Sequence, residues 1–183
     1  MSVIVIGFTT LDGRTADPDG SDGTAPGGWM FRYGPEHVVG DKFRLGGLLR
    51  DGVLLLGRRT WQHFGELWPT REDEFSQRMN AADKLVATRT LTDASGWANS
   101  RLLEGDLLAA VRTETRDVVV TGSVGVVHQL VGADLVDEYR LVTVPVLLGT
   151  GSRLFPEGAA TGGFRCAQAE PVGPHLYSRY VRA

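Results

Sequence analysis

The sequence predicts an α/β fold in which a mixed, mostly parallel sheet is flanked by helices and finishes in antiparallel strands. Short runs of β-branched or leucine residues recur along the chain, and two of them turn at a glycine into a segment with helical spacing. The last portion has two alternating runs, Phe164 to Ala169 and Leu176 to Val181, linked through Pro171, Gly173 and Pro174. Such a link is typical of an antiparallel pair. A parallel βα core with this ending indicates a mixed sheet.

Length and composition narrow the class of protein. The 183 residues, 42% of them hydrophobic, predict one domain over residues 1–183 with a sizeable core and neither disorder nor a membrane span. The net charge of −3 and the lack of a basic tract argue against nucleic acid as a partner. Cys166 is the only cysteine, and the N-terminus lacks a signal-peptide pattern. Both features predict a cytoplasmic protein without an internal disulfide.

The N-terminal part predicts a buried strand followed by a long loop. Val3 to Ile6 is β-branched throughout, and the strand ends near Asp12 and Gly13. Asp12 has two interpretations, a substrate contact or a residue that orders the turn, and a lone carboxylate before glycine more often does the latter. Thr15 to Gly34 is rich in glycine, proline and aspartate and carries Trp29, Phe31 and Tyr33. These aromatic rings either form a mobile lid over a flat ligand, which we favour, or pin the loop to the core.

The next segments predict a helix, the central strand and two further helices. Pro35 to Arg50 has an apolar side and is expected to be helical, although Gly46-Gly47 weakens it. Val53 to Leu56 is expected to be a strand buried on both faces. Gly57 ends this strand, and a helix is expected to begin at Arg58. Glu72 to Ala82 predicts another helix.

The second half repeats this pattern. Lys84 to Thr88 and Asp117 to Thr121 predict strands, and Asp106 is positioned to cap the helix between them. A further helix is expected after Gly122-Ser123, and Tyr139 to Val144 predicts another strand. A glycine-rich loop follows it.

Three of these strand ends carry groups that suit phosphate: Gly57 to Thr60, Thr88-Arg89 and Gly122-Ser123. A strand that turns at a glycine into a helix presents free backbone N–H groups and a positive dipole end, and arginines reinforce the site. One such motif is as well explained by a capped turn with solvated arginines. Three of them favour an extended ligand with several phosphates, such as a dinucleotide. Neither glycine site matches G-x-G-x-x-G, so an ordinary Rossmann site is not expected.

Other chemistries have less support. The four histidines lack metal-ligand spacing, no nucleophile elbow occurs, and Cys166 lies in an expected strand without an activating neighbour. No carboxylate pair suited to hydrolysis stands out. The sequence therefore favours a reaction whose difficult step belongs to a cofactor.

Motifs along almost the whole chain carry a resemblance to a known family. They are TLDGR at Thr10 to Arg14, GGWMFRYG at Gly27 to Gly34, LLLGRRTWQHF at Leu54 to Phe64, WP at Trp68-Pro69, RMN at Arg78 to Asn80, KLVATRTLT at Lys84 to Thr92, VVVTGS at Val118 to Ser123, LVDEYRL at Leu135 to Leu141 and PVLLGTGSRLFP at Pro145 to Pro156. Together they resemble the dihydrofolate reductase-like superfamily, and most closely the reductase domain of bifunctional riboflavin-biosynthesis deaminase-reductases. The resemblance implies a three-layer fold and an NADPH-dependent reductase.

The resemblance also implies roles for individual residues. Gly57, Arg58, Arg59 and Thr60 are expected to hold the pyrophosphate and the 2′-phosphate, Thr88 and Arg89 to lie beside the 2′-phosphate, and Gly122, Ser123, Val124, Gly125 and Val126 to follow the pyrophosphate towards the nicotinamide. Asp12, Trp29, Phe64, Trp68 and the loop from Gly149 to Gly151 are expected on the substrate side. Asp12 or a bound water would manage the proton.

Two departures from the family pattern limit the choice of substrate. No cytidine-deaminase-like zinc domain is seen in these residues, so the complete bifunctional riboflavin enzyme is not expected. Asp41 lies where dihydrofolate reductases carry an acidic substrate contact, but its surroundings are glycine-rich and differ, so dihydrofolate is not expected as the main substrate.

Two functional hypotheses remain. The first is an NADPH-dependent reductase of a small pyrimidine- or pterin-like heterocycle or an imine or carbonyl compound, with 5-amino-6-(5-phosphoribosylamino)uracil included by family analogy. The second is a non-enzymatic protein that binds a flat small molecule. A flavin-dependent activity has no motif in its favour. A homodimer formed through the C-terminal strands is also expected.

Overall fold

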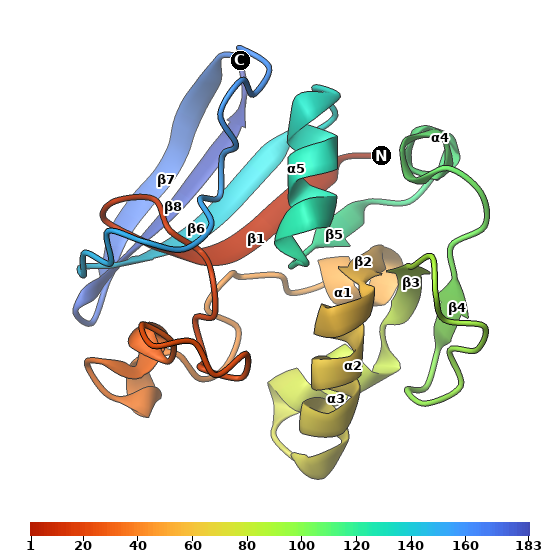
Figure 1. Ribbon diagram of the computed structural model, residues 1–183, viewed down its shortest axis with the longest axis horizontal. Helices are drawn as coiled ribbons and strands as arrows, with labels where there is room; N and C mark the ends of the chain where they lie inside the picture. Colours follow the sequence, from red (N-terminus) through yellow and green to blue (C-terminus); the bar gives the residue numbers. More distant parts are fainter.

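The computed structural model describes residues 1–183, and its central feature is an eight-stranded sheet in the order β4-β3-β2-β5-β1-β6-β8-β7 (Figure 1). The strands are β1 Val3–Thr10, β2 Val53–Gly57, β3 Asp83–Ala87, β4 Ser100–Leu102, β5 Val118–Val120, β6 Glu138–Val144, β7 Phe164–Val172 and β8 His175–Arg182. The first six strands pair in parallel. β8 pairs antiparallel with both β6 and β7. The predicted mixed sheet with antiparallel C-terminal strands is confirmed.

Helices cover both faces of the sheet. They are α1 Leu48–Asp51, α2 Arg58–Leu67, α3 Glu74–Ala81, α4 Leu107–Thr113 and α5 Val124–Gly132, with 3₁₀ turns η1 Trp29–Phe31, η2 Pro35–His37 and η3 Trp68–Thr70. Alternate residues of β1 point to opposite faces. Val3 and Val5 join the apolar cluster beneath α4 and α5, whereas Ile4 and Ile6 join the cluster beneath α1, α2 and α3 (Figure 1). The continuous apolar strands of the sequence are therefore explained by burial on both faces.

The helix predicted for Pro35 to Arg50 is wrong. Only η2 and the short α1 are helical there, and the residues between them run irregularly. Gly40 and Gly46 have φ of 79° and 48°, and Arg44 has φ of 55°. These left-handed residues interrupt the helix because right-handed helical backbone needs negative φ. Phe43 and Leu45 are nevertheless buried, which accounts for the apolar spacing in this segment.

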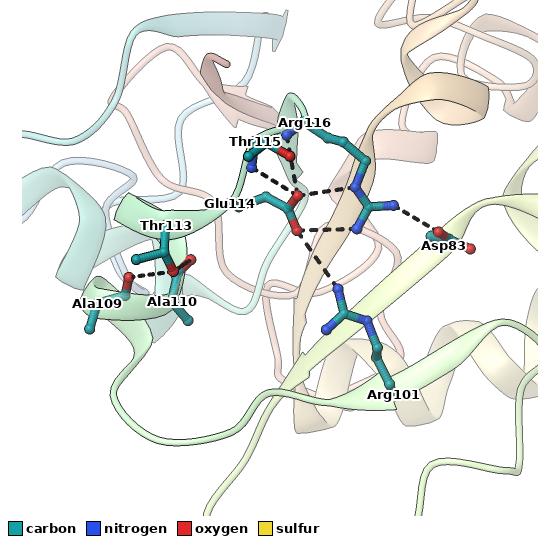
Figure 2. A network of polar contacts seen from close by, with 8 residues as sticks. All are labelled: Asp83, Arg101, Ala109, Ala110, Thr113, Glu114, Thr115 and Arg116. Atoms are coloured by element: carbon teal, nitrogen blue, oxygen red, sulfur yellow. Dashed lines mark hydrogen bonds and ion pairs between the residues drawn. The ribbon is translucent and has the colours of Figure 1, made fainter.

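A polar network ties α4 to the sheet at the end away from the glycine turns (Figure 2). Glu114 accepts two bonds of 3.1 Å from the Arg116 guanidinium, which also donates to Asp83 Oδ2 at 2.7 Å. Arg101 Nη2 lies 3.7 Å from Glu114 Oε2. The hydrogen bonds from Arg116 lower the pKa of Glu114 to about 2. Because Asp83 begins β3, this network holds the amino ends of the strands and leaves their carboxyl ends to the candidate site.

No helix in the structure is both long enough and apolar enough to cross a lipid bilayer.

Candidate functional site

The three phosphate-compatible strand ends border one cleft. β3, β2 and β5 are neighbours in the parallel sheet, so their carboxyl ends lie at the same edge. A cleft of about 650 Å³ opens there. Its walls include Arg58, Arg59, Thr88, Arg89, Ser123, Gly125 and Val126, all predicted cofactor residues. We call this the cofactor cleft. Sequence reasoning missed further lining residues of this cleft, which include Leu103, Gly105, Asp106, Leu107 and Gln129.

Two helices begin at the cofactor cleft without a side-chain cap. α2 follows Gly57 and α5 follows Ser123, and neither residue's side chain accepts a bond from the first turn. In contrast, Asp73 caps α3 and Asp106 caps α4. The uncapped ends carry unsatisfied backbone N–H groups and the positive ends of two helix dipoles. This arrangement suits an anion that lies between α2 and α5.

Glycines allow these two helix ends to approach closely. A Cβ atom on Gly57 would lie 2.1 Å from Ser123 Oγ, and one on Gly122 would lie 3.0 Å from Thr60 Oγ1. The Gly57 N–H donates to the Gly122 carbonyl at 3.1 Å. Gly122 has φ of 131°, which side chains rarely allow. The predicted residues Gly57, Thr60 and Gly122 therefore join the ends of β2 and β5, and Val124 is the first residue of α5.

The arginines of the cofactor cleft are not neutralised by the protein. Arg58, Arg59 and Arg89 form no ion pair, and Arg58 Nη1 donates only to Gln62 Oε1 at 3.1 Å. Thr88 orders the loop beyond β3, since its Oγ1 accepts the N–H groups of residues 90 and 91 at 3.1 Å each. Three free guanidinium groups at one cleft favour a ligand with more than one phosphate.

A second hollow, of about 630 Å³, lies between the long loop and the segment after β6. Its walls include Trp29, Phe31, Arg32, Tyr33 and the segment from Pro145 to Leu148. We call it the aromatic pocket. Because β6 lies next to β1 and β1 next to β5, the sheet order places this pocket beyond the α5 end of the cofactor cleft.

The loop behind the aromatic pocket is pinned rather than open. Trp29 is 4% exposed, and its Nε1 donates to the Ala16 carbonyl at 2.8 Å. Asp17 accepts bonds from residues 22 and 24 of the same loop, and Asp19 pairs with His63 of α2 at 2.7 Å. The lid interpretation does not hold for Trp29, because a ring buried against its own loop cannot swing over a ligand. Phe31 and Tyr33 do remain exposed.

Asp12 organises a turn. Its carboxylate accepts bonds from Thr10 Oγ1 at 2.5 Å and from the N–H groups of Leu148 and Gly149 at 3.3 and 2.9 Å. These hydrogen bonds hold the pKa of Asp12 far below its usual value, and the bond from Thr10 makes the largest contribution. A carboxylate held ionised in this way is a poor proton donor. The structure therefore favours the turn interpretation over the expected catalytic role.

The other expected substrate residues lie outside the aromatic pocket. Gly149 and Gly151 accept bonds from Arg14 through their carbonyls at 3.3 and 2.7 Å, so they anchor the loop that continues the pocket wall. Phe64 and Trp68 pack edge to face with ring centroids 5.6 Å apart. Phe75 and Trp97 complete this cluster around α2 and α3. No sequence signal distinguishes these aromatic residues from those that line the pocket.

Comparison with known proteins identifies the family of the chain. Residues 1–177 match the RibD C-terminal domain family. The chain belongs to this family. It is a family of reductases that typically use NAD(P)H. A Bacillus subtilis (strain 168) relative, uncharacterized protein YyaP, is 27% identical over 111 residues, which are 56% of this chain and 58% of the relative.

Solved structures share the fold. A Shewanella sp. PV-4 protein described as "Putative riboflavin biosynthesis protein" superposes with a TM-score of 0.74 at 23% identity, covering 100% of this chain and 99% of its own. RibD of Acinetobacter baumannii gives a TM-score of 0.66 at 14% identity, and this chain spans 58% of its length. A pyrimidine reductase-like protein from Corynebacterium diphtheriae gives 0.56 at 10% identity over 100% and 92% of the two chains. The dihydrofolate reductase-like fold of this family is thereby confirmed.

Proposed function

We propose that this RibD C-terminal domain protein is an NADPH-dependent reductase of a small, flat heterocyclic substrate. The observation that carries the proposal is the cofactor cleft, where two uncapped helix N-termini meet three unpaired arginines. A pyrophosphate fits between α2 and α5, because both helices direct N–H groups there. An additional phosphate on the ribose fits the free guanidinium groups. NADPH has both features, whereas NADH has the pyrophosphate but lacks the additional phosphate on the ribose.

The order of the strands supports one direction for this cofactor. The residues at the end of β3, Thr88 and Arg89, suit the adenosine half, and Ser123 to Val126 suit the half that carries the nicotinamide. The aromatic pocket begins beyond that second half, next to β1 and β6. NADPH, when bound, supplies the hydride of the reduction. The protein's contribution is to orient both reactants and to exclude water between them.

The aromatic pocket supports a flat ring as substrate. Phe31 and Tyr33 are 39% and 41% exposed there, and Arg32 on the same wall forms no ion pair. Exposed rings of this kind stack on planar ligands. The names of the Corynebacterium and Shewanella structures, which refer to pyrimidine reduction and riboflavin biosynthesis, agree with a pyrimidine-like substrate. Because Asp12 is ionised, we assign the proton to a water molecule.

Titration of the purified protein with NADPH and NADH, followed by nicotinamide fluorescence, tests the proposal. Arg89→Ala should weaken NADPH binding about 10- to 100-fold, since bonds to charged groups contribute roughly 1.5–3 kcal/mol. NADH binding should be weak and nearly unchanged. Arg50→Ala is the matched control, because Arg50 is exposed and pairs only with Asp51. If neither nucleotide binds to the wild-type protein, the proposed function is wrong.

A second candidate is a non-enzymatic protein that binds a flat small molecule in the aromatic pocket. The lowered pKa of Asp12 favours this candidate, because an ionised Asp12 cannot serve as the expected proton donor for a ligand in the pocket. Stopped-flow measurement of NADPH oxidation across a panel of pyrimidines, pterins, imines and carbonyl compounds distinguishes the two candidates. Turnover of any of them supports the reductase, and tight ligand binding without NADPH oxidation supports the second candidate.

A further inference from the structure

The cofactor cleft holds charges of both signs that do not pair with each other. Arg58, Arg59 and Arg89 line it, and Asp106 lines it as the one carboxylate. None of these four side chains takes part in an ion pair. Asp106 accepts a bond from the Ala109 N–H at 2.9 Å through Oδ1, and its Oδ2 atom accepts no hydrogen bond. The charged atoms of the arginines and of Asp106 therefore lie more than 4 Å apart within one cleft, and one oxygen of the carboxylate accepts no hydrogen bond.

This separation restricts how a dinucleotide can lie. A phosphate beside Asp106 would meet a like charge, whereas a phosphate beside the arginines would meet opposite charges. The phosphates therefore take the arginine side. The part of the ligand that reaches Asp106 must be neutral and must carry a hydrogen-bond donor, because an ionised carboxylate only accepts.

The residues next to Asp106 suit a flat apolar ring. Leu103 and Leu107 also line the cleft: Leu103 is half-buried against the apolar cluster beneath α4 and α5, and Leu107 is 9% exposed within that cluster. A purine base has apolar faces that would contact these leucines and a polar edge that would reach the carboxylate. At its 6-position adenine carries an amino group, which donates, whereas a 6-oxopurine carries a carbonyl, which accepts.

We propose that Leu103, Asp106 and Leu107 form the base-binding wall of the cofactor cleft, and that Asp106 accepts a hydrogen bond from the amino group of adenine. This inference rests on the proposed function. It makes the protein selective for an adenine dinucleotide over its hypoxanthine analogue, because the analogue would place a carbonyl oxygen against a carboxylate.

The test compares the affinities of NADPH and of nicotinamide hypoxanthine dinucleotide phosphate for the purified protein. The wild type should bind NADPH at least about tenfold more tightly than it binds the hypoxanthine dinucleotide. In the Asp106→Ser variant the ratio of these two affinities should fall to about one. Serine can still cap α4, but its side chain is uncharged and too short to contact the base. Asp73→Ser is the matched control, since Asp73 caps α3 outside the cleft in the same way, and it should keep the wild-type ratio.

Each other outcome overturns the inference. A wild type that binds both dinucleotides equally, or an Asp106→Ser variant that keeps the ratio, shows that the carboxylate does not contact the base. Equal weakening of both dinucleotides shows a structural role alone. Asp106 lies at the ribose if its replacement changes the ratio of the NADPH and NADH affinities but not the ratio of the NADPH and hypoxanthine dinucleotide affinities. If the wild type binds neither phosphorylated dinucleotide, the proposed function is wrong as well as the inference. This result differs from the other outcomes, in which the wild type still binds NADPH.

Discussion

Replacement of Gly57 by alanine tests the close contact between α2 and α5. The added Cβ would lie 2.1 Å from Ser123 Oγ and 3.0 Å from the backbone nitrogen of Ser123. A carbon and an oxygen atom do not approach closer than about 3 Å, so Ser123 must move by roughly 1 Å. Overpacking of this kind costs about 1–3 kcal/mol. For a chain of this size each kcal/mol lowers Tm by about 2–4 °C. The displaced α5 terminus should also weaken NADPH binding about tenfold or more.

Thermal and urea denaturation measure the change in stability, and the fluorescence titration measures the change in binding. Gly132→Ala is the control, because a Cβ there meets nothing within 4 Å and its φ is not positive. That variant should be as stable as the wild type or slightly more stable. Gly57→Ala combined with Ser123→Gly should recover part of the loss, since the Oγ and Cβ atoms are then absent. If Gly57→Ala is as stable as the wild type and binds NADPH equally well, the contact does not constrain the site.

Three further predictions concern two buried ionisable groups and one half-buried one, each checked by denaturation across pH. Lys84→Met should lower stability by about 1–3 kcal/mol at pH 7, because Lys84 Nζ donates to three backbone carbonyls that would lose their partner. Burial lowers the pKa of Lys84 to about 8, so wild-type stability should rise between about pH 8 and 10.5, whereas that of the variant should not. His175→Phe should remove a loss of stability that the wild type shows as pH falls below about 6.5. Both ring nitrogens of His175 are buried without a partner, and this burial lowers its pKa. Glu114→Gln should cost about 1–3 kcal/mol at pH 7. The wild-type advantage should disappear as pH falls from 4.5 towards 2, because the folded-state pKa is about 2.

Most strands and helices were predictable because the hydrophobic pattern that identifies each of them lies within its own few residues. A run such as Val53 to Leu56 is too short and too apolar to be anything but a buried strand when a glycine and a helical pattern follow. The helix prediction for Pro35 to Arg50 was wrong because the structure of this segment does not depend on its local sequence pattern. Its apolar residues are buried by tertiary packing, and left-handed residues such as Arg44, which no local rule identifies, set its path.

The cofactor side of the site was predictable for a related reason. Parallel strands bring their carboxyl ends to one edge, so Arg58, Arg89 and Ser123 meet without any knowledge of the loops. The substrate side depends on how a long loop packs. For that reason the sequence predicts both Trp29 and Trp68 on the substrate side, whereas only Trp29 lines the aromatic pocket and Trp68 lies in a separate aromatic cluster. The homodimer expected through the C-terminal strands stays a prediction, which sedimentation equilibrium tests.

The position of β1 in the sheet has a consequence for synthesis on the ribosome. β1 emerges before every other strand of this sheet, but its two neighbours are β5 and β6, which begin at Val118 and Glu138. The Ser2 N–H, just before β1, bonds to Asp117 Oδ1. A nascent chain that has reached Leu102 already contains β2, β3 and β4, which pair with one another, while β1 has no partner and leaves four buried-type apolar residues in water. Such long-range pairing folds slowly. The apolar residues of β1 therefore depend on residues beyond 117 to be shielded from water, and chains that terminate earlier should be prone to aggregate.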